Sequence, residues 1–86
     1  MYALNMNTEN DELTVKIATE LRVARERMTG VRPTNADLAK AAHVSGMAMG
    51  RYLDGVRAIP VPTLVLICKA LGVSPGSILD EALQEM

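Results

Sequence analysis

The chain has 86 residues, 49% of them hydrophobic, with no Trp, no Phe and a single cysteine. This length allows one domain with one small core, and a lone cysteine excludes an internal disulfide framework and is typical of a reducing compartment. We find no signal-peptide pattern and no apolar run long enough to cross a bilayer, which predicts a cytoplasmic protein without a membrane partner.

Charge is distributed unevenly along the chain, although the net charge is only −1. Residues 1–20 carry a net charge of −3, and residues 70–86 also carry −3. Residues 21–69 contain eight basic and three acidic side chains, a net charge of +5. A basic centre can attract phosphate while the whole molecule stays near neutral, so a nucleic-acid partner would bind there.

Residues 1–7 carry no charge and no periodic pattern, and we predict a flexible N-terminal arm. A first helix is predicted to begin after Thr8, because Asp11 stands at the spacing of a capping box. We expect this helix to end at Gly30. Apolar residues at intervals of three and four predict one buried stripe along it: Leu13, Ile17, Leu21, Ala24 and Met28.

A second helix is predicted over about residues 35–42. Thr34 is a typical N-cap residue, and Asp37 three residues later completes a capping box with Asp in place of Glu. Leu38, Ala39 and Ala42 form an apolar stripe at helical spacing.

A turn and a third helix are predicted next. His43 lies in the turn, and Ser45 is the natural N-cap of a helix that extends to about Leu53. Within this helix Met49 and Leu53 should face inward, because they are four residues apart, with Tyr52 at the edge.

Two further helices complete the chain. Gly55 ends the third helix, and the fourth is predicted from Pro62, a favoured first helical position, to Gly72. It is apolar around nearly its whole circumference, which predicts burial on more than one side. The fifth begins at Ser74-Pro75. Five helical segments without alternating β patterns predict an all-α fold.

The ordered set of motifs resembles the Cro/repressor-type (XRE-like) helix-turn-helix DNA-binding family of bacteriophages and bacteria. The resemblance extends over about residues 17–80 and rests on Thr34-Asn35, Leu38-Ala39, Val44-Ser45, Met49, Gly55, Thr63-Leu64 and Ala70-Leu71-Gly72-Val73. It implies a compact five-helix, lambda-repressor-like domain over residues 8–86. The second and third helices would form the helix-turn-helix.

The resemblance also implies contacts with double-stranded DNA. Gly46, Met47 and Arg51 match the base-contacting positions of the family. Among them only Arg51 offers hydrogen-bond donors, and a bidentate arginine on guanine is the commonest specific contact. The expected phosphate contacts are Asn35, Ser45, Arg57 and Arg22. The alternative is that Arg57 is an ordinary loop arginine and Arg22 part of a solvated helix face.

Several positions depart from the family pattern. Polar side chains usually stand where this chain has Gly46 and Gly50, and glycine weakens a helix. These glycines either let the helix approach DNA closely or leave part of the specificity to DNA shape. His43 stands where glycine is usual, and Asn35 has a shorter reach than the usual glutamine.

The C-terminal apolar stripe predicts a homodimer, because the last helix commonly forms the two-fold interface in this family. A dimer would bind a palindromic operator with two helices one DNA turn apart. The alternative is that the stripe packs on the core of its own chain. The expected interface residues are Leu66, Ile78, Leu79, Leu83 and Met86.

The predicted function is therefore a sequence-specific transcriptional regulator of the phage Cro or repressor type. One alternative is an antitoxin whose C-terminal residues hold a toxin. Another is a protein-interaction module that has lost base recognition, which the small or apolar Gly46, Met47 and Gly50 would suit. One His, one Cys, no glycine-rich phosphate loop and no paired carboxylates argue against an enzyme, a metal site, a cofactor or a small-molecule ligand.

Overall fold

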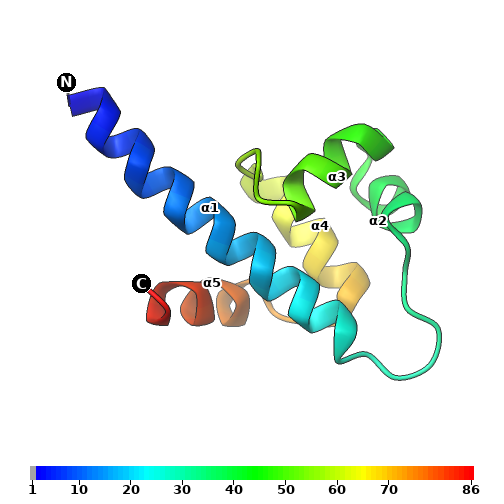
Figure 1. The fold of residues 1–86 in the computed structure, drawn as a ribbon. Helices are drawn as coiled ribbons and strands as arrows, with labels where there is room; N and C mark the ends of the chain where they lie inside the picture. Colours follow the sequence, from blue (N-terminus) through cyan, green and yellow to red (C-terminus); the bar gives the residue numbers. More distant parts are fainter. Residues whose placement is uncertain (1) are drawn as a thin grey trace.

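The computed structural model describes the backbone of residues 2–86 and the side chains of residues 12–86. This part of the chain contains five helices and no strand, which confirms the predicted all-α fold (Figure 1). The helices are α1 (Tyr2–Glu26), α2 (Asn35–Ala42), α3 (Gly46–Leu53), α4 (Val61–Leu71) and α5 (Pro75–Gln84).

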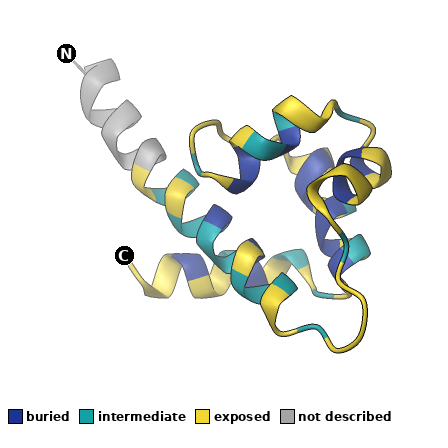
Figure 2. Ribbon diagram, turned by 45° about the vertical axis from the view of Figure 1, so that its right-hand side comes forward, coloured by how far each residue is buried: buried dark blue, intermediate teal, exposed yellow. Residues whose placement is uncertain are grey.

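The long helix α1 joins two groups of helices. On one side α5 packs along it, and on the other it contacts α3 and α4 (Figure 1). Helix α2 packs on both α3 and α4, so these three helices form the second group. Figure 2 shows that the buried positions of α2, α3 and α4 face the interior that these helices share.

The two ends of α1 differ from the prediction in different ways. At the N-terminal end the predicted helix start after Thr8 is wrong, since α1 begins at Tyr2 and includes most of the predicted arm of residues 1–7. At the other end the predicted stop at Gly30 is wrong, since α1 ends at Glu26. The guanidinium of Arg32 donates to the carbonyl of Glu26 at 3.0 Å, which satisfies one of the carbonyls that a helix end leaves free.

The core is built from aliphatic side chains, as the composition predicts. Its largest fully buried side chains are Leu21, Leu38, Met49, Ile67 and Cys68. Burial raises the pKa of the Cys68 thiol, which lies within the core. The remaining buried apolar residues come from all five helices.

The loop after α3 lies directly against α1. A Cβ atom on Gly55 would lie 3.2 Å from the Cα of Val15 and 3.6 Å from the Cβ of Ala18. Gly55 also has a φ of +77°, a conformation that glycine adopts without a steric penalty. Ala18 is fully buried at this contact, although it stands outside the predicted stripe.

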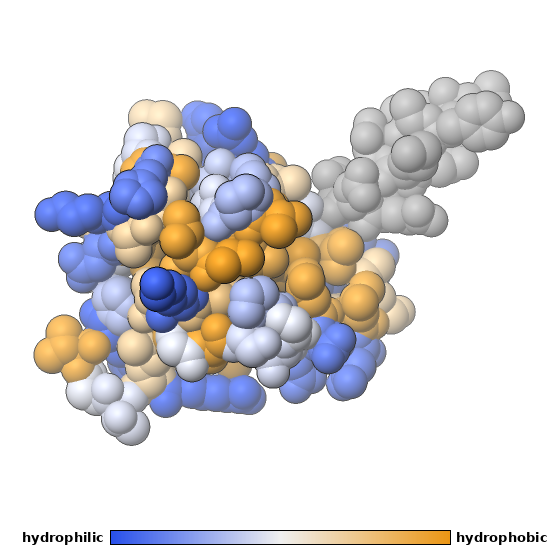
Figure 3. Space-filling view, turned by 180° about the vertical axis from the view of Figure 1, so that it is seen from behind, coloured by the Kyte–Doolittle hydropathy of each residue, from blue (hydrophilic) through white to orange (hydrophobic). Residues whose placement is uncertain are grey.

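Helix α4 is buried toward the core on one side and exposed on another. It begins at Val61, one residue before the predicted start, and ends at Gly72 in the left-handed conformation, as predicted. Val61 and Val65 are 71% and 43% exposed, so one side of α4 is open to solvent. The face opposite to that of Figure 1 has an apolar area near its centre (Figure 3). Among the described residues no single helix is long and apolar enough to cross a membrane; α4 and α5 reach that length and composition only together, across a bend of 105°.

Helix α5 folds back onto its own chain. Ser74 caps it through a hydrogen bond from the Ser77 backbone at 3.3 Å, as predicted. Ile78 is 5% exposed and belongs to the core, so its prediction as a dimer-interface residue is wrong. Leu66 and Leu79 are half-buried against the core, whereas Leu83 and Met86 are more than half exposed. A dimer contact through Leu83 and Met86 therefore stays a prediction.

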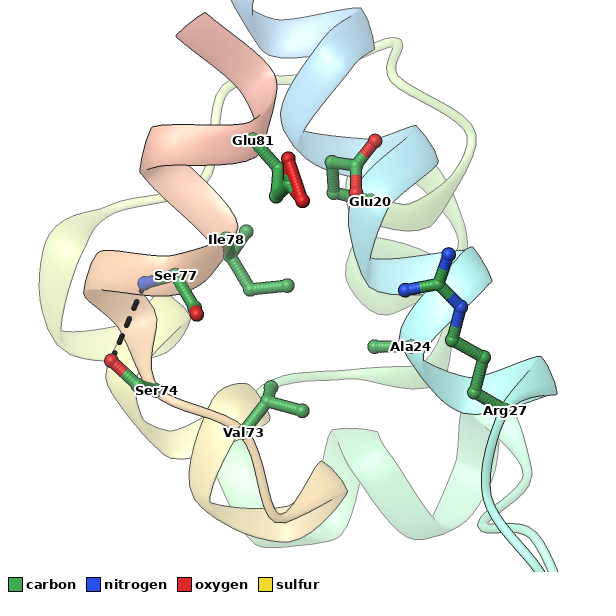
Figure 4. A pocket seen from close by; sticks show the side chains of 8 residues that line it. All are labelled: Glu20, Ala24, Arg27, Val73, Ser74, Ser77, Ile78 and Glu81. Carbon is green, nitrogen blue, oxygen red and sulfur yellow. Dashed lines mark hydrogen bonds between the residues drawn. The ribbon is translucent and has the colours of Figure 1, made fainter. Parts of the chain in front are cut away.

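A cavity of about 260 Å³ lies between α1 and α5. Figure 4 shows Glu81 of α5 beside Glu20 of α1 at one end of this cavity, with Arg27 just beyond the C-terminal end of α1. A hydrogen bond with Glu85 raises the pKa of Glu20, and slight burial and the charges of Glu85 and Glu81 act in the same direction. Lys16 compensates only in part, with its Nζ 3.9 Å from Glu85 Oε1. The seam between α1 and α5 is therefore rich in carboxylates.

We expect the variant Glu20→Gln to be slightly more stable than the parent at pH 7, by less than about 1 kcal/mol because the carboxylates are exposed and screened. A carboxyl whose pKa is raised by folding contributes stability at low pH and loses it as the pH rises through the folded pKa. The Tm difference between variant and parent should therefore shrink between pH 7 and pH 4. A difference that grows on acidification would contradict this account.

Candidate nucleic-acid interface

The start of α2 is held by a reciprocal cap, as predicted. The Thr34 backbone N–H donates to Asp37 Oδ2 at 3.0 Å, and the Asp37 N–H donates to Thr34 Oγ1 at 3.1 Å. The first of these bonds lowers the pKa of the Asp37 carboxyl, so this contribution to stability is lost as the pH falls through the folded pKa. The cap fixes where α2 begins.

The turn between α2 and α3 is closed by backbone hydrogen bonds. His43 adopts the left-handed conformation, with φ 59° and ψ 40°, and is the one non-glycine residue of the described chain with positive φ. Its N–H bonds the carbonyl of Lys40, and the Val44 N–H bonds the carbonyl of Ala39 at 3.0 Å. This double bonding is the Schellman arrangement, in which glycine is usual. His43 is thus a turn residue, and its strain is offset by these bonds.

Helix α3 begins at Ser45, whose Oγ accepts from the Ala48 N–H at 3.0 Å. The predicted N-cap of α3 at Ser45 is therefore confirmed. Ser45 is exposed, but its hydroxyl oxygen already accepts the hydrogen bond that caps α3. A phosphate contact by Ser45 stays a prediction.

The two sides of α3 are clearly different. Met49 and Leu53 are buried, as predicted. Tyr52 is also buried, at 5% exposure, so its predicted place at the edge is wrong. The guanidinium of Arg57 lies 5.7 Å from the centre of the Tyr52 ring and covers it, a cation–π arrangement.

The outward side of α3 carries the predicted base-contacting residues. Gly46, Met47 and Arg51 are exposed, and Gly50 is half-buried. Asp54 forms the C-cap and is exposed at the same end as Arg51. Among the described side chains Asp54 has no ion pair with Arg51 or Arg57. Its negative charge therefore remains beside the basic groups.

The predicted phosphate-binding residues differ in how far their polar groups are free. Asn35, the first residue of α2, accepts a hydrogen bond from Arg25 at 2.7 Å through its side-chain oxygen. This contact brings a basic side chain to the start of α2. Sequence reasoning missed it, because eight residues of loop separate α1 from α2 and no local pattern positions Arg25.

Arg22 is engaged within the chain. Its guanidinium donates to the carbonyl of Leu53, at the end of α3, and to Thr19 Oγ1 at 3.3 Å. These bonds tie α1 to the C-terminal end of α3, where cationic groups are favourable. They support the structural alternative for Arg22, while its phosphate contact stays a prediction.

The Arg57 side chain, in the loop after α3, is exposed to solvent. The backbone N–H groups of Val56 and Arg57 both bond the carbonyl of Arg51, at 3.0 and 3.4 Å. They are therefore occupied, and any anion at this loop would be held mainly by the exposed guanidinium of Arg57. No cluster of His, Cys, Asp or Glu that could hold a metal ion lies among the described residues.

Comparisons with protein-family models, with curated proteins and with solved structures found no match to this chain.

Proposed function

We propose that this chain is a sequence-specific DNA-binding transcriptional regulator of the Cro or repressor type, acting in the cytoplasm. In this proposal α2, the turn at His43 and α3 form a helix-turn-helix, and α3 enters the major groove. The observation that carries the proposal is the two-sided character of α3: Met49 and Leu53 anchor it in the core, while Met47 and Arg51 stand exposed on the opposite side.

Charge supports the same assignment. Residues 21–69 carry the net positive charge, and their exposed members include Arg51, Arg57 and Lys40. The start of α2 adds backbone N–H groups and the Arg25–Asn35 pair. Helix N-termini attract anions through these N–H groups and the helix dipole. Phosphates could thus be bound on both sides of α3, before it at α2 and after it at Arg57.

A homodimer would give this small domain two recognition helices. A single α3 of eight residues contacts only a few base pairs, and a palindromic operator doubles the contacts. Leu83 and Met86 are the exposed apolar residues of the C-terminal stripe that a second copy could cover.

A protein-interaction module is the second candidate. It is favoured by the exposed apolar side chains Val61, Val65 and Leu83, and by an outward side of α3 that has a single hydrogen-bonding cation. In this alternative, Arg51 and Arg57 would contribute only general solubility.

Binding to DNA separates the two functions. The purified protein is titrated against DNA from upstream of its own gene and against random-sequence DNA, at 50 and 200 mM salt. A regulator should bind one palindromic segment at least about 10³-fold more tightly than random DNA, with affinity that falls steeply as salt rises. A folded protein that binds neither DNA would refute the regulator and favour the interaction module.

A further inference from the structure

The outward side of α3 pairs one apolar and one cationic side chain. Met47 is 71% exposed, and Arg51 follows one helical turn later on the same side. Residues four apart on a helix lie about 6 Å from each other along its axis. Met47 is the largest apolar side chain that α3 leaves in water, and a partner with an apolar group at this position would bury it.

The glycines beside Met47 are not required by the fold. Neither Gly46 nor Gly50 has a positive φ, and beyond the adjoining residues and the backbone of α3 itself a Cβ atom at either position would meet no atom within 4 Å. Gly55, in contrast, is needed both for its φ and for its contact with α1. Alanine would favour the helix at both positions, since glycine is the weaker helix former. The two missing side chains leave the α3 backbone open to a close partner.

We infer that α3 recognises a pyrimidine 5-methyl group with Met47 and, within about two base pairs of it, a guanine with Arg51. This inference rests on the proposed function and deepens it. The 5-methyl group of thymine, shared by 5-methylcytosine, is the apolar group that bases present in the major groove. The flexible, polarisable thioether of Met47 suits such a contact. Gly50 allows the α3 backbone to lie against the groove floor beside it.

The test begins with DNA selected from a random library by the parent protein. Each thymine of a half-site is then replaced by uracil, which removes only the methyl group. We expect one replacement, within about two base pairs of a guanine, to weaken binding about fourfold, the value of one buried methyl group. Replacing that thymine–adenine pair by 5-methylcytosine–guanine, compared with cytosine–guanine, shows whether the methyl group is recognised in either base.

Two protein variants make the test specific. Met47→Ala should lose affinity for the thymine site and bind thymine and uracil equally. Val31→Ala is the matched control, because Val31 is 97% exposed in the loop between α1 and α2, and it should keep the full discrimination. If the parent binds a selected site but tolerates uracil at every position, this inference is overturned and the proposed function stands. If no site is selected, both are overturned.

Gly50→Ala tests the close approach. The open space at Gly50 predicts a variant with a higher Tm than the parent. We expect the same variant to bind the selected site at least about tenfold more weakly, because its new methyl group would meet the groove floor. A more stable variant with unchanged affinity would show that α3 does not approach the DNA at Gly50.

Discussion

Replacing Arg51 by alanine is expected to remove most of the preference of the protein for its operator over random DNA. Arg51 is the one exposed residue of α3 with several hydrogen-bond donors, and a bidentate arginine contributes about 1–3 kcal/mol of discrimination at each half-site. The ratio of the two dissociation constants, measured by fluorescence anisotropy at fixed salt, should therefore fall about 5- to 150-fold per half-site. An unchanged ratio would mean that α3 is not the recognition helix.

Arg57→Ala is the matched control for this variant. Its side chain lies on the loop after α3, beside the Tyr52 ring, so it can reach a phosphate but belongs to no base-contacting helix face. Binding should weaken about equally for operator and random DNA, and the slope of log affinity against log salt should fall by about 1. Circular dichroism must first show that loss of the Tyr52 contact leaves the helices intact.

Met49→Ala is expected to destabilise the protein by about 2–5 kcal/mol, a large share of the stability of a small domain. Met49 is fully buried in the core cluster that α2, α3 and α4 share, so its truncation leaves a cavity. The free energy of unfolding can be measured by urea denaturation.

Met47→Ala, two residues away on the same helix, provides the comparison. Met47 is 71% exposed, and its truncation should change the free energy of unfolding by no more than about 0.5 kcal/mol. Met49→Ala should thus lower the stability of the fold, whereas Met47→Ala should affect DNA binding and leave the stability nearly unchanged. Equal destabilisation by both would contradict the orientation of α3.

The starts of α2, α3 and α5 could be predicted because their signals are local. Thr34 with Asp37, Ser45 and Ser74 each bond a backbone N–H three residues away, so their roles depend on a few neighbouring residues. The inward placement of Met49 and Leu53 follows from helical spacing in the same way. His43 could be assigned to the turn because the helices on both sides of it were defined.

The wrong predictions depend on contacts that helical periodicity does not encode. Ile78 packs within the core because α5 packs against α1, the helix at the other end of the chain. The Arg57 guanidinium lies over the Tyr52 ring, and α1 ends early where Arg32 donates to the carbonyl of Glu26. Helical periodicity predicts which side of a helix is apolar. It does not predict whether that side packs against the same chain or against a partner.

The sequence predicts which residue types lie at the candidate interface better than it predicts which of their polar groups are free of internal hydrogen bonds. Exposure of Met47 and Arg51 follows from the helical pattern. The bonds of Arg22 to Leu53 and of Arg25 to Asn35 do not, because both join elements whose relative position only the tertiary fold defines. Such internal bonds decide which basic groups are left for phosphate.

The attachment of α5 to α1 has a consequence for amide hydrogen exchange. Within α5 only Ile78 and Ala82 are buried, and the seam brings Glu20, Glu81 and Glu85 together. Helices α2, α3 and α4 instead supply most of the core cluster, to which α5 adds only Ile78. Such segments open as separate cooperative units with different free energies. The amides of α5 should therefore exchange through detachment of this helix alone. The amides of α2 and α4 should exchange only when the whole domain unfolds.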